Sequence, residues 1–357
     1  MLETVFVYSG IFLLTIFCSF LSTKKDRFIY IFISIVIVAI ISGFRDYSVG
    51  IDTLTYTRVF SSINGTLDTS RYVYVPDMED SFIVFVRVLL FFSGGSFQFL
   101  FCVIAFVIHF FFIRRFWELR HQLSFPLSVF LYIIAFLFSS LNIMRQLCAV
   151  ALVFWSTRFI GSKNYLLFSL FVLLAMCFHT SAVLAFLYLA FELFRWHELE
   201  PKQKNILVIL VVLSSFVMPL AFVFFAERYI HYLGTPSVDI GFLLPTKVLF
   251  YAFLLYYLHK TTINYEHMPN HIHISQITIY VVCGLILTFL GYFFRFVQRI
   301  GLYFSIFEIV ACSAFCHTYK NNYFLVTTGV LVLWLIPFAI DCMNNGNGQF
   351  PFAFFYK

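Results

Sequence analysis

Charged side chains are scarce in this chain. Asp, Glu, Lys and Arg make up 11% of its 357 residues, against about 25% in an ordinary soluble domain. Hydrophobic residues make up 62%, and 52 residues are Phe. A water-soluble fold of this size cannot bury that much apolar surface. The composition therefore excludes a soluble enzyme, a disordered chain and a coiled coil, and it indicates a polytopic membrane protein.

Metal-binding patterns are missing as well. The eight cysteines fall almost entirely inside apolar runs, where a cysteine behaves as a small hydrophobic residue. No CxxC motif occurs, and the acidic patch of Asp77, Glu79 and Asp80 is not a DxD motif. Lys and Arg are scattered among short loops, which argues against a nucleic-acid partner. We expect no metal, no cofactor and no disulfide framework.

Apolar runs predict an all-α protein with about twelve transmembrane helices, because about 20 residues span the hydrocarbon core. The predicted spans cover residues 5–21, 28–41, 96–113, 125–141, 143–160, 165–178, 180–194, 205–225, 240–258, 274–293, 300–316 and 323–340. We expect one transmembrane domain over residues 1–357, with an outer loop over about 43–80 and a second over about 227–239. Residues 81–93 form a half-length apolar segment, which is typical of an interfacial or re-entrant element.

The positive-inside rule sets the orientation. The first run is preceded by Glu3 and followed by a basic cluster at residues 24–27, so it begins outside, and twelve spans place both termini there. Ten of the 23 Lys and Arg residues still fall in the predicted outer segments, which is many for that side. Glu308 lies mid-span, on the opposite side of its helix from Arg299, and we expect it to pair within the bundle.

Four of these outer arginines interrupt or border apolar runs. They are Arg45 after the second run, Arg145 at a break between two runs, and Arg295 and Arg299 inside a long apolar stretch. Arg295, Arg299 and Tyr303 share one helical face at intervals of four residues. Guanidinium groups suit phosphate oxygens, and an arginine inside a membrane normally faces a cavity or a partner. The set predicts a diphosphate site, unless the arginines snorkel or form local ion pairs.

Two further outer residues are candidates for chemistry. His179 splits the apolar stretch 165–194, where its imidazole either serves as a general base or caps the next helix. Asp52, with Tyr56 one turn later, either binds sugar hydroxyls, accepts a proton or caps the helix that follows. The residues alone leave these alternatives open.

Several short motifs resemble those of EpsG/Wzy-type polysaccharide polymerases. They occur in the family's order over about residues 1–305: Gly43-Phe44-Arg45, Val49-Gly50-Ile51-Asp52-Thr53 with Tyr56, Met144-Arg145-Gln146, Phe178-His179-Thr180-Ser181-Ala182, and the face of Arg295, Arg299 and Tyr303. Glu79-Asp80-Ser81-Phe82 stands where the family often has Glu-Pro-Gly-aromatic. The resemblance therefore assigns no role to the acidic patch.

The resemblance implies a metal-independent, GT-C-like O-antigen or exopolysaccharide polymerase of the bacterial inner membrane, with its site facing the periplasm. Such an enzyme joins undecaprenyl-diphosphate-linked oligosaccharide repeat units by inverting glycosyl transfer, and its partners would include a chain-length regulator and a flippase. The implied roles are diphosphate binding by Arg145, Arg295 and Arg299, catalysis by Arg145 and the base His179, and acceptor binding or loop organisation by Arg45, Asp52, Tyr56 and Tyr303.

Three other functions stay open at the level of sequence. An O-antigen ligase would transfer the finished chain to the lipid A core, but ligases tend to carry their large outer loop late in the chain, and here it is early. A lipid-linked oligosaccharide flippase or other transporter would be expected to have related halves and polar sites near the midplane, and the sequence has no internal repeat. A membrane O-acetyltransferase would use His179.

Overall fold

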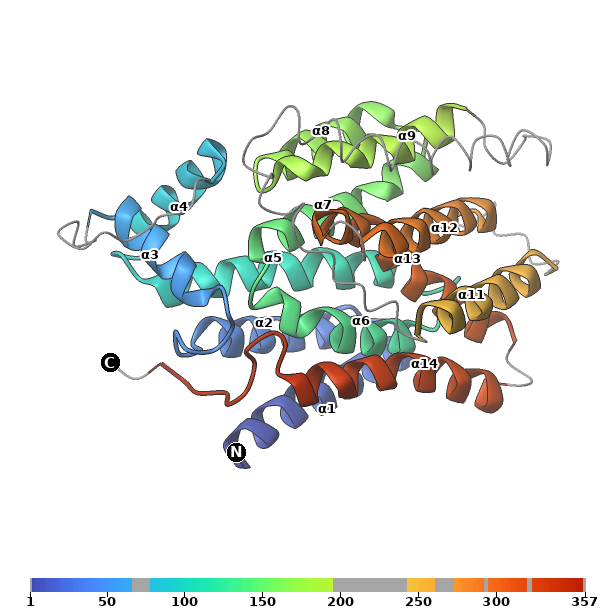
Figure 1. Cartoon of the computed structure of the whole chain (residues 1–357), viewed down its shortest axis with the longest axis horizontal. Coiled ribbons are helices and arrows are strands. Elements are labelled where there is room, and N and C mark those ends of the chain that lie inside the picture. Colours follow the sequence, from blue (N-terminus) through green and yellow to red (C-terminus); the bar gives the residue numbers. More distant parts are fainter. Residues whose placement is uncertain are drawn as a thin grey trace.

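The computed structural model describes residues 2–65, 78–194, 243–260, 272–291, 295–319 and 323–355. Within these ranges the regular structure is helical, and a single antiparallel bridge joins Arg45 to Phe354. The helices pack side by side, and both termini lie toward the end of the bundle where α3 and α4 are found (Figure 1).

The helices follow the apolar runs. They are α1 (Leu2–Lys25), α2 (Ile29–Gly43), α3 (Thr53–Ile63), α4 (Asp80–Phe92), α5 (Phe97–Glu118), α6 (Phe125–Ser140), α7 (Met144–Gly161), α8 (Tyr165–Met176), the 3-10 helix η1 (Thr180–Ala185), α9 (Phe186–Leu193), α11 (Leu243–His259), α12 (Ile274–Gly291), α13 (Arg295–Thr318) and α14 (Tyr323–Asn344). Eleven of the twelve predicted spans coincide with these elements. The span at 205–225 and the loop at 227–239 lie outside the described residues.

Among the described helices, α1, α5, α12, α14 and most of α13 are long and apolar enough to cross a membrane. The chain is therefore a multi-pass membrane protein, as its composition predicts, and its described elements are helices. The total of twelve spans and the side of the membrane on which the termini lie stay predictions.

Helix α7 lies at the centre of the core. It packs against α5, α8 and α13, and nearly all of its side chains are buried. Aromatic rings fill the space between α5, α6 and α7: the Phe112 ring lies 4.9 Å from that of Tyr132 and 6.0 Å from that of Phe154. Because lipid tails are as apolar as these rings, close packing rather than transfer out of water holds such helices together.

The half-length segment forms the short helix α4. One of its faces is buried through Phe82, Val86 and Leu90, while Val84 and Phe91 are exposed. Its 13 residues are too few to span a hydrocarbon core. An amphipathic helix of this kind suits the membrane surface, so its interfacial placement stays a prediction that its length and faces favour.

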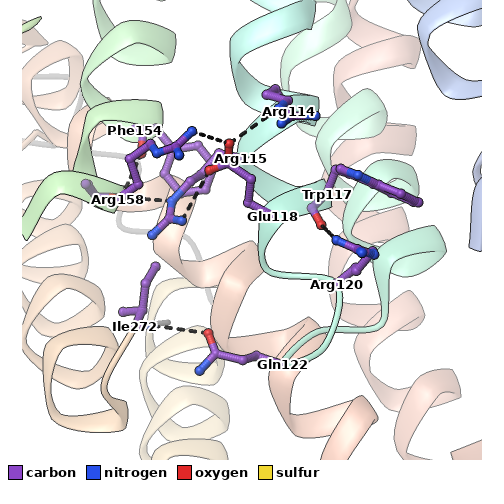
Figure 2. Close-up of polar contacts among 10 residues, drawn as sticks. Arg114, Arg115, Trp117, Glu118, Arg120, Gln122, Phe154, Arg158 and Ile272 are labelled. Carbon is purple, nitrogen blue, oxygen red and sulfur yellow. Dashed lines mark hydrogen bonds and ion pairs between the residues drawn. The ribbon is translucent and has the colours of Figure 1, made fainter. Parts of the chain in front are cut away.

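Residues predicted on the inner face meet at one end of α5 and α7 (Figure 2). The Glu118 side chain is 7% exposed and forms ion pairs with Arg158 at 2.6 Å, Arg114 at 3.3 Å and Arg115 at 3.6 Å. Arg115 is fully buried, and its Nε donates to Thr157 Oγ1 at 3.1 Å. One carboxylate thus ties the end of α5 to α7.

A second buried ion pair joins α11 to α13. Glu308 Oε2 lies 2.7 Å from Lys247 Nζ, and the Glu308 side chain is 1% exposed. The predicted pairing of Glu308 within the bundle is confirmed. An unpaired acid at this depth would be costly in a membrane, so Lys247 explains why the helix tolerates it.

We predict that Glu118→Gln destabilises the protein. The substitution leaves three guanidinium groups around a neutral amide, and removing one partner of a buried ion pair costs about 3 kcal/mol or more. The measurement is the thermal unfolding midpoint of the protein purified in detergent. Asp26→Asn is the matched control: Asp26 pairs with Arg120 at 2.9 Å but is 68% exposed, and such pairs contribute about 1 kcal/mol or less. Equal midpoints in the two variants would contradict this prediction.

Candidate functional site

Arg45 organises the loop that follows α2. Its side chain is buried, and its guanidinium donates to the carbonyls of Ser42 at 2.5 Å and Leu141 at 3.1 Å and to Thr53 Oγ1 at 3.3 Å. The guanidinium also lies over the Phe101 ring. All of its nitrogens are thus directed at the protein itself. Of the two roles predicted for Arg45, these contacts are those of loop organisation rather than acceptor binding.

The C-terminal segment, residues 347–355, is hydrogen-bonded to the same loop. Backbone hydrogen bonds of 2.8–3.3 Å pair residues 44–51 with residues 347–355: Asp46 N with Ala353 O, Phe355 N with Phe44 O, Gly50 N with Gly348 O, and Ile51 N with Asn347 O. The segment is anchored in turn to α1, because the Tyr8 hydroxyl donates to the Gln349 carbonyl at 2.9 Å. The sequence does not predict this pairing, because backbone hydrogen bonds between distant segments require no particular residue type.

Asn142 connects the loop and the C-terminal segment to the start of α7. Its Oδ1 accepts from the Asp52 backbone N–H at 3.2 Å, and its Nδ2 donates to the Asn347 carbonyl at 2.9 Å. Gly50 has a φ of +91°, and a Cβ there would lie 3.0 Å from Asn142 Oδ1. Glycine alone adopts that conformation readily and permits so close an approach. These contacts fix the turn that carries Arg145.

Arg145 lies in the first turn of α7, and its side chain is 18% exposed. Its Nη1 forms an ion pair with Glu79 Oε2. Its Nε is buried and has no hydrogen-bond partner among the described residues. The guanidinium is therefore only partly satisfied by the protein, and its remaining donor capacity suits an anionic ligand.

Tyr56 approaches Arg145 from α3, and Asp52 lies just before that helix. Burial raises the pKa of Tyr56, and the charge of the neighbouring Arg145 opposes that rise. Asp52 occupies the N-cap position of α3, yet its side chain makes no capping hydrogen bond. Its charge interacts with Tyr56 instead. The structure therefore gives no support to the capping role considered for Asp52. The interaction with Tyr56 is what connects Asp52 to the cluster.

Glu79 reaches the cluster from the start of α4. It is the N-cap residue of that helix but makes no capping hydrogen bond to it. Its Oε1 instead accepts from the Thr180 backbone N–H at 3.1 Å, while Oε2 pairs with Arg145. The sequence assigned no role to Glu79 or to Ser181. The signals for Glu79 were its place in the acidic patch and in the segment that stands where the family often has Glu-Pro-Gly-aromatic.

His179 caps η1 and begins a chain of hydrogen bonds. Its Nδ1 accepts from the Ser181 backbone N–H at 3.3 Å and lies 2.6 Å from Ser181 Oγ. Ser181 Oγ lies 3.0 Å from the hydroxyl of Tyr303 on α13. The capping alternative considered for His179 is therefore present in the structure.

The pKa of His179 is lowered to about 4, chiefly by burial. The Glu79 carboxylate opposes the shift, and the charges of Arg145 and Arg299 reinforce it. The imidazole is consequently neutral at pH 7, since the pH lies well above the folded-state value.

Arg299 approaches the cluster from α13. Its backbone carbonyl accepts from Gln146 Nε2 at 2.6 Å, which joins α13 to the first turn of α7. Its side chain is exposed, and its charge interacts with His179. Arg295 begins α13, but its side chain lies outside the described part of the chain. Of the three arginines predicted to bind a diphosphate, the structure describes the side chains of Arg145 and Arg299, and their role in binding stays a prediction.

The structure brings together one polar cluster from five separate elements of the chain. Its members are Asp52, Tyr56, Glu79, Arg145, His179, Ser181, Arg299 and Tyr303. Arg45 is not a member of this cluster; it holds the loop that leads into α3. Among the described residues, no group of three or more His, Cys, Asp or Glu side chains could hold a metal ion. Two arginines beside a neutral imidazole can bind an anion and donate hydrogen bonds to it.

The helices and this cluster define a multi-pass membrane protein with a polar site that includes two arginines at one end of its bundle. The EpsG family model matches residues 28–354, so the chain belongs to the EpsG family. The resemblance seen in the motifs is thereby confirmed, and the match includes the C-terminal segment that pairs with the loop. No curated protein and no solved structure matches the chain.

We predict that Gly50→Ala disturbs the site. An alanine at positive φ costs about 1–2 kcal/mol, and its Cβ would in addition press on Asn142 Oδ1. The measurement is a lower thermal unfolding midpoint in detergent. Gly10→Ala in α1 is the control, because nothing lies within 4 Å of a Cβ at that position. If the midpoint of Gly50→Ala matches that of the wild type, the loop is not held as described.

Proposed function

We propose that this protein is an exopolysaccharide or O-antigen polymerase that joins undecaprenyl-diphosphate-linked oligosaccharide repeat units. The observation that carries the proposal is the approach of Arg145 and Arg299, from different helices, to one partly exposed cluster beside His179. Membership of the EpsG family, which suggests a polymerase-like activity, supports it.

In the proposed reaction the growing chain is transferred from its lipid diphosphate to the non-reducing end of the next lipid-linked unit. Arg145, Arg299 and, by its place one turn earlier, Arg295 stabilise the negative charge that develops on the departing diphosphate. Guanidinium groups can supply this stabilisation, so the step requires no metal from the protein. A direct displacement on an α-linked donor inverts the anomeric centre.

The position of the cluster suits a lipid-bound substrate. It lies at the end of the bundle that carries α3, α4 and the termini (Figure 1), so a diphosphate at the membrane surface reaches it without leaving the lipid. We place this end at the periplasmic face of the inner membrane, with about twelve spans and both termini on that side. In this orientation the Glu118 cluster lies on the cytoplasmic side, in accordance with the positive-inside rule.

We predict that deleting the gene leaves surface glycolipids with a single repeat unit and without a ladder of longer chains. A polymerase acts after the unit has been made and flipped, so only elongation is lost. The measurement is gel electrophoresis of extracted glycolipids, with the plasmid-borne gene as the control for restoration. Loss of the single-unit product as well would indicate a ligase or a flippase instead.

We predict that Arg145→Ala and Arg299→Ala each reduce polymerisation of purified lipid-linked units by at least about a hundredfold, the effect of losing one donor that stabilises transition-state charge. Protein levels in the membrane should stay normal. Arg58→Ala is the matched control, because Arg58 is an exposed arginine of α3 at the same end of the bundle. Wild-type rates in both cluster variants would exclude the diphosphate site.

A further inference from the structure

The hydrogen bonds of His179 fix its tautomer. The Ser181 backbone N–H can only donate, and it donates to His179 Nδ1. Nδ1 must therefore present its lone pair, so the proton of the neutral imidazole is on Nε2. The Ser181 hydroxyl then donates to the same Nδ1 and accepts from Tyr303. Neutral His179 has no free lone pair with which to accept a proton.

Glu79 is the described carboxylate of the cluster that contacts both Arg145 and the backbone next to His179. Within the part of the chain that the structure describes, its two oxygens accept one hydrogen bond each, from the Thr180 backbone N–H and from Arg145. An ionised carboxylate has about four acceptor positions, so about two stay open. The side chain is 16% exposed, which leaves a path to a bound hydroxyl. It interacts electrostatically with both His179 and Tyr303.

We propose that Glu79, and not His179, is the proton acceptor for the attacking hydroxyl; this inference rests on the proposed function. The acceptor oxygen forms a bond to the anomeric carbon of the donor while the bond from that carbon to the diphosphate oxygen breaks. The bonding electron pair leaves with the diphosphate, and the hydroxyl proton passes to an oxygen of Glu79. His179 keeps its Nε2 proton and donates a hydrogen bond to substrate oxygen.

The ion pair with Arg145 couples this step to donor binding. In the structure Arg145 is the partner of Glu79. A bound diphosphate shares the guanidinium and withdraws positive charge from Glu79, and a carboxylate with less positive charge around it takes up a proton more readily. Glu79 is thus best able to deprotonate the acceptor sugar when the diphosphate-linked donor sugar is bound. This order disfavours a proton transfer without glycosyl transfer.

The test compares Glu79→Gln with His179→Asn in the full-length protein, using lipid-linked repeat units isolated from the deletion strain. We expect Glu79→Gln to lower kcat by at least about a hundredfold, the usual contribution of a general base. Donor affinity should stay the same or rise, because the amide no longer neutralises Arg145. A merely structural role would weaken donor binding instead.

The pH profile separates the two residues. The titratable and charged groups that interact with Glu79 are Arg145 on α7, His179 before η1 and Tyr303 on α13. Arg299 interacts with His179, and Asp80 is the next residue in the chain. A general base must be ionised to act, so the wild-type rate should fall as the pH drops. Glu79→Gln should lose this fall in rate, which is the acidic limb of the profile. His179→Asn keeps a capping side chain and should keep the limb.

Each outcome decides between the proposals. A Glu79→Gln enzyme with the wild-type rate and acidic limb, or a His179→Asn enzyme without the limb, overturns the role of Glu79 while the polymerase function stands. A wild-type protein that makes no ladder overturns both. If Glu79→Gln does not fold, Glu79→Asp is measured in its place. A reduced rate that still falls at acidic pH supports the proposal, and a rate below that of Arg145→Ala overturns it.

Discussion

The end of the bundle that carries α3 and α4 depends on the break between α6 and α7. A helix break exposes backbone groups, and in a membrane these must find partners inside the protein. Here the Leu141 carbonyl accepts from Arg45, and Asn142 joins the Asp52 backbone to Asn347. The hydrogen bonds that satisfy the break therefore also assemble the loop, the C-terminal segment and the first turn of α7, where Arg145 lies.

Much of the architecture could be predicted because hydropathy reports burial in lipid directly. The helix boundaries at Phe125, Tyr165 and Ile274 coincide with the ends of apolar runs. Contacts between distant segments could not be predicted, since nothing in the residue type of Arg45 distinguishes a buried loop organiser from a ligand. Likewise, Glu79 carries no local sign that it faces Arg145 rather than its own helix.

The candidate site resolves a conflict between folding and function. Arginines proposed to bind a diphosphate carry charge that the protein must tolerate in an apolar setting. Glu79 compensates Arg145, while Arg299 is left exposed to solvent or headgroups. Charge is thus neutralised at the partly buried Arg145 and left unpaired by Glu79 at the exposed Arg299, so Arg299 remains accessible to an anion.

The two ends of the bundle use the same pairing of carboxylate and guanidinium for different purposes. Glu118 is enclosed by three arginines, and its surroundings leave little access for another molecule. Glu79 has one arginine and one backbone N–H, and it lies on a partly exposed surface. An enclosed carboxylate can only hold helices together. A carboxylate with open acceptor positions beside a partly satisfied arginine can exchange partners, and exchange of partners is what a reaction between two bound lipids requires.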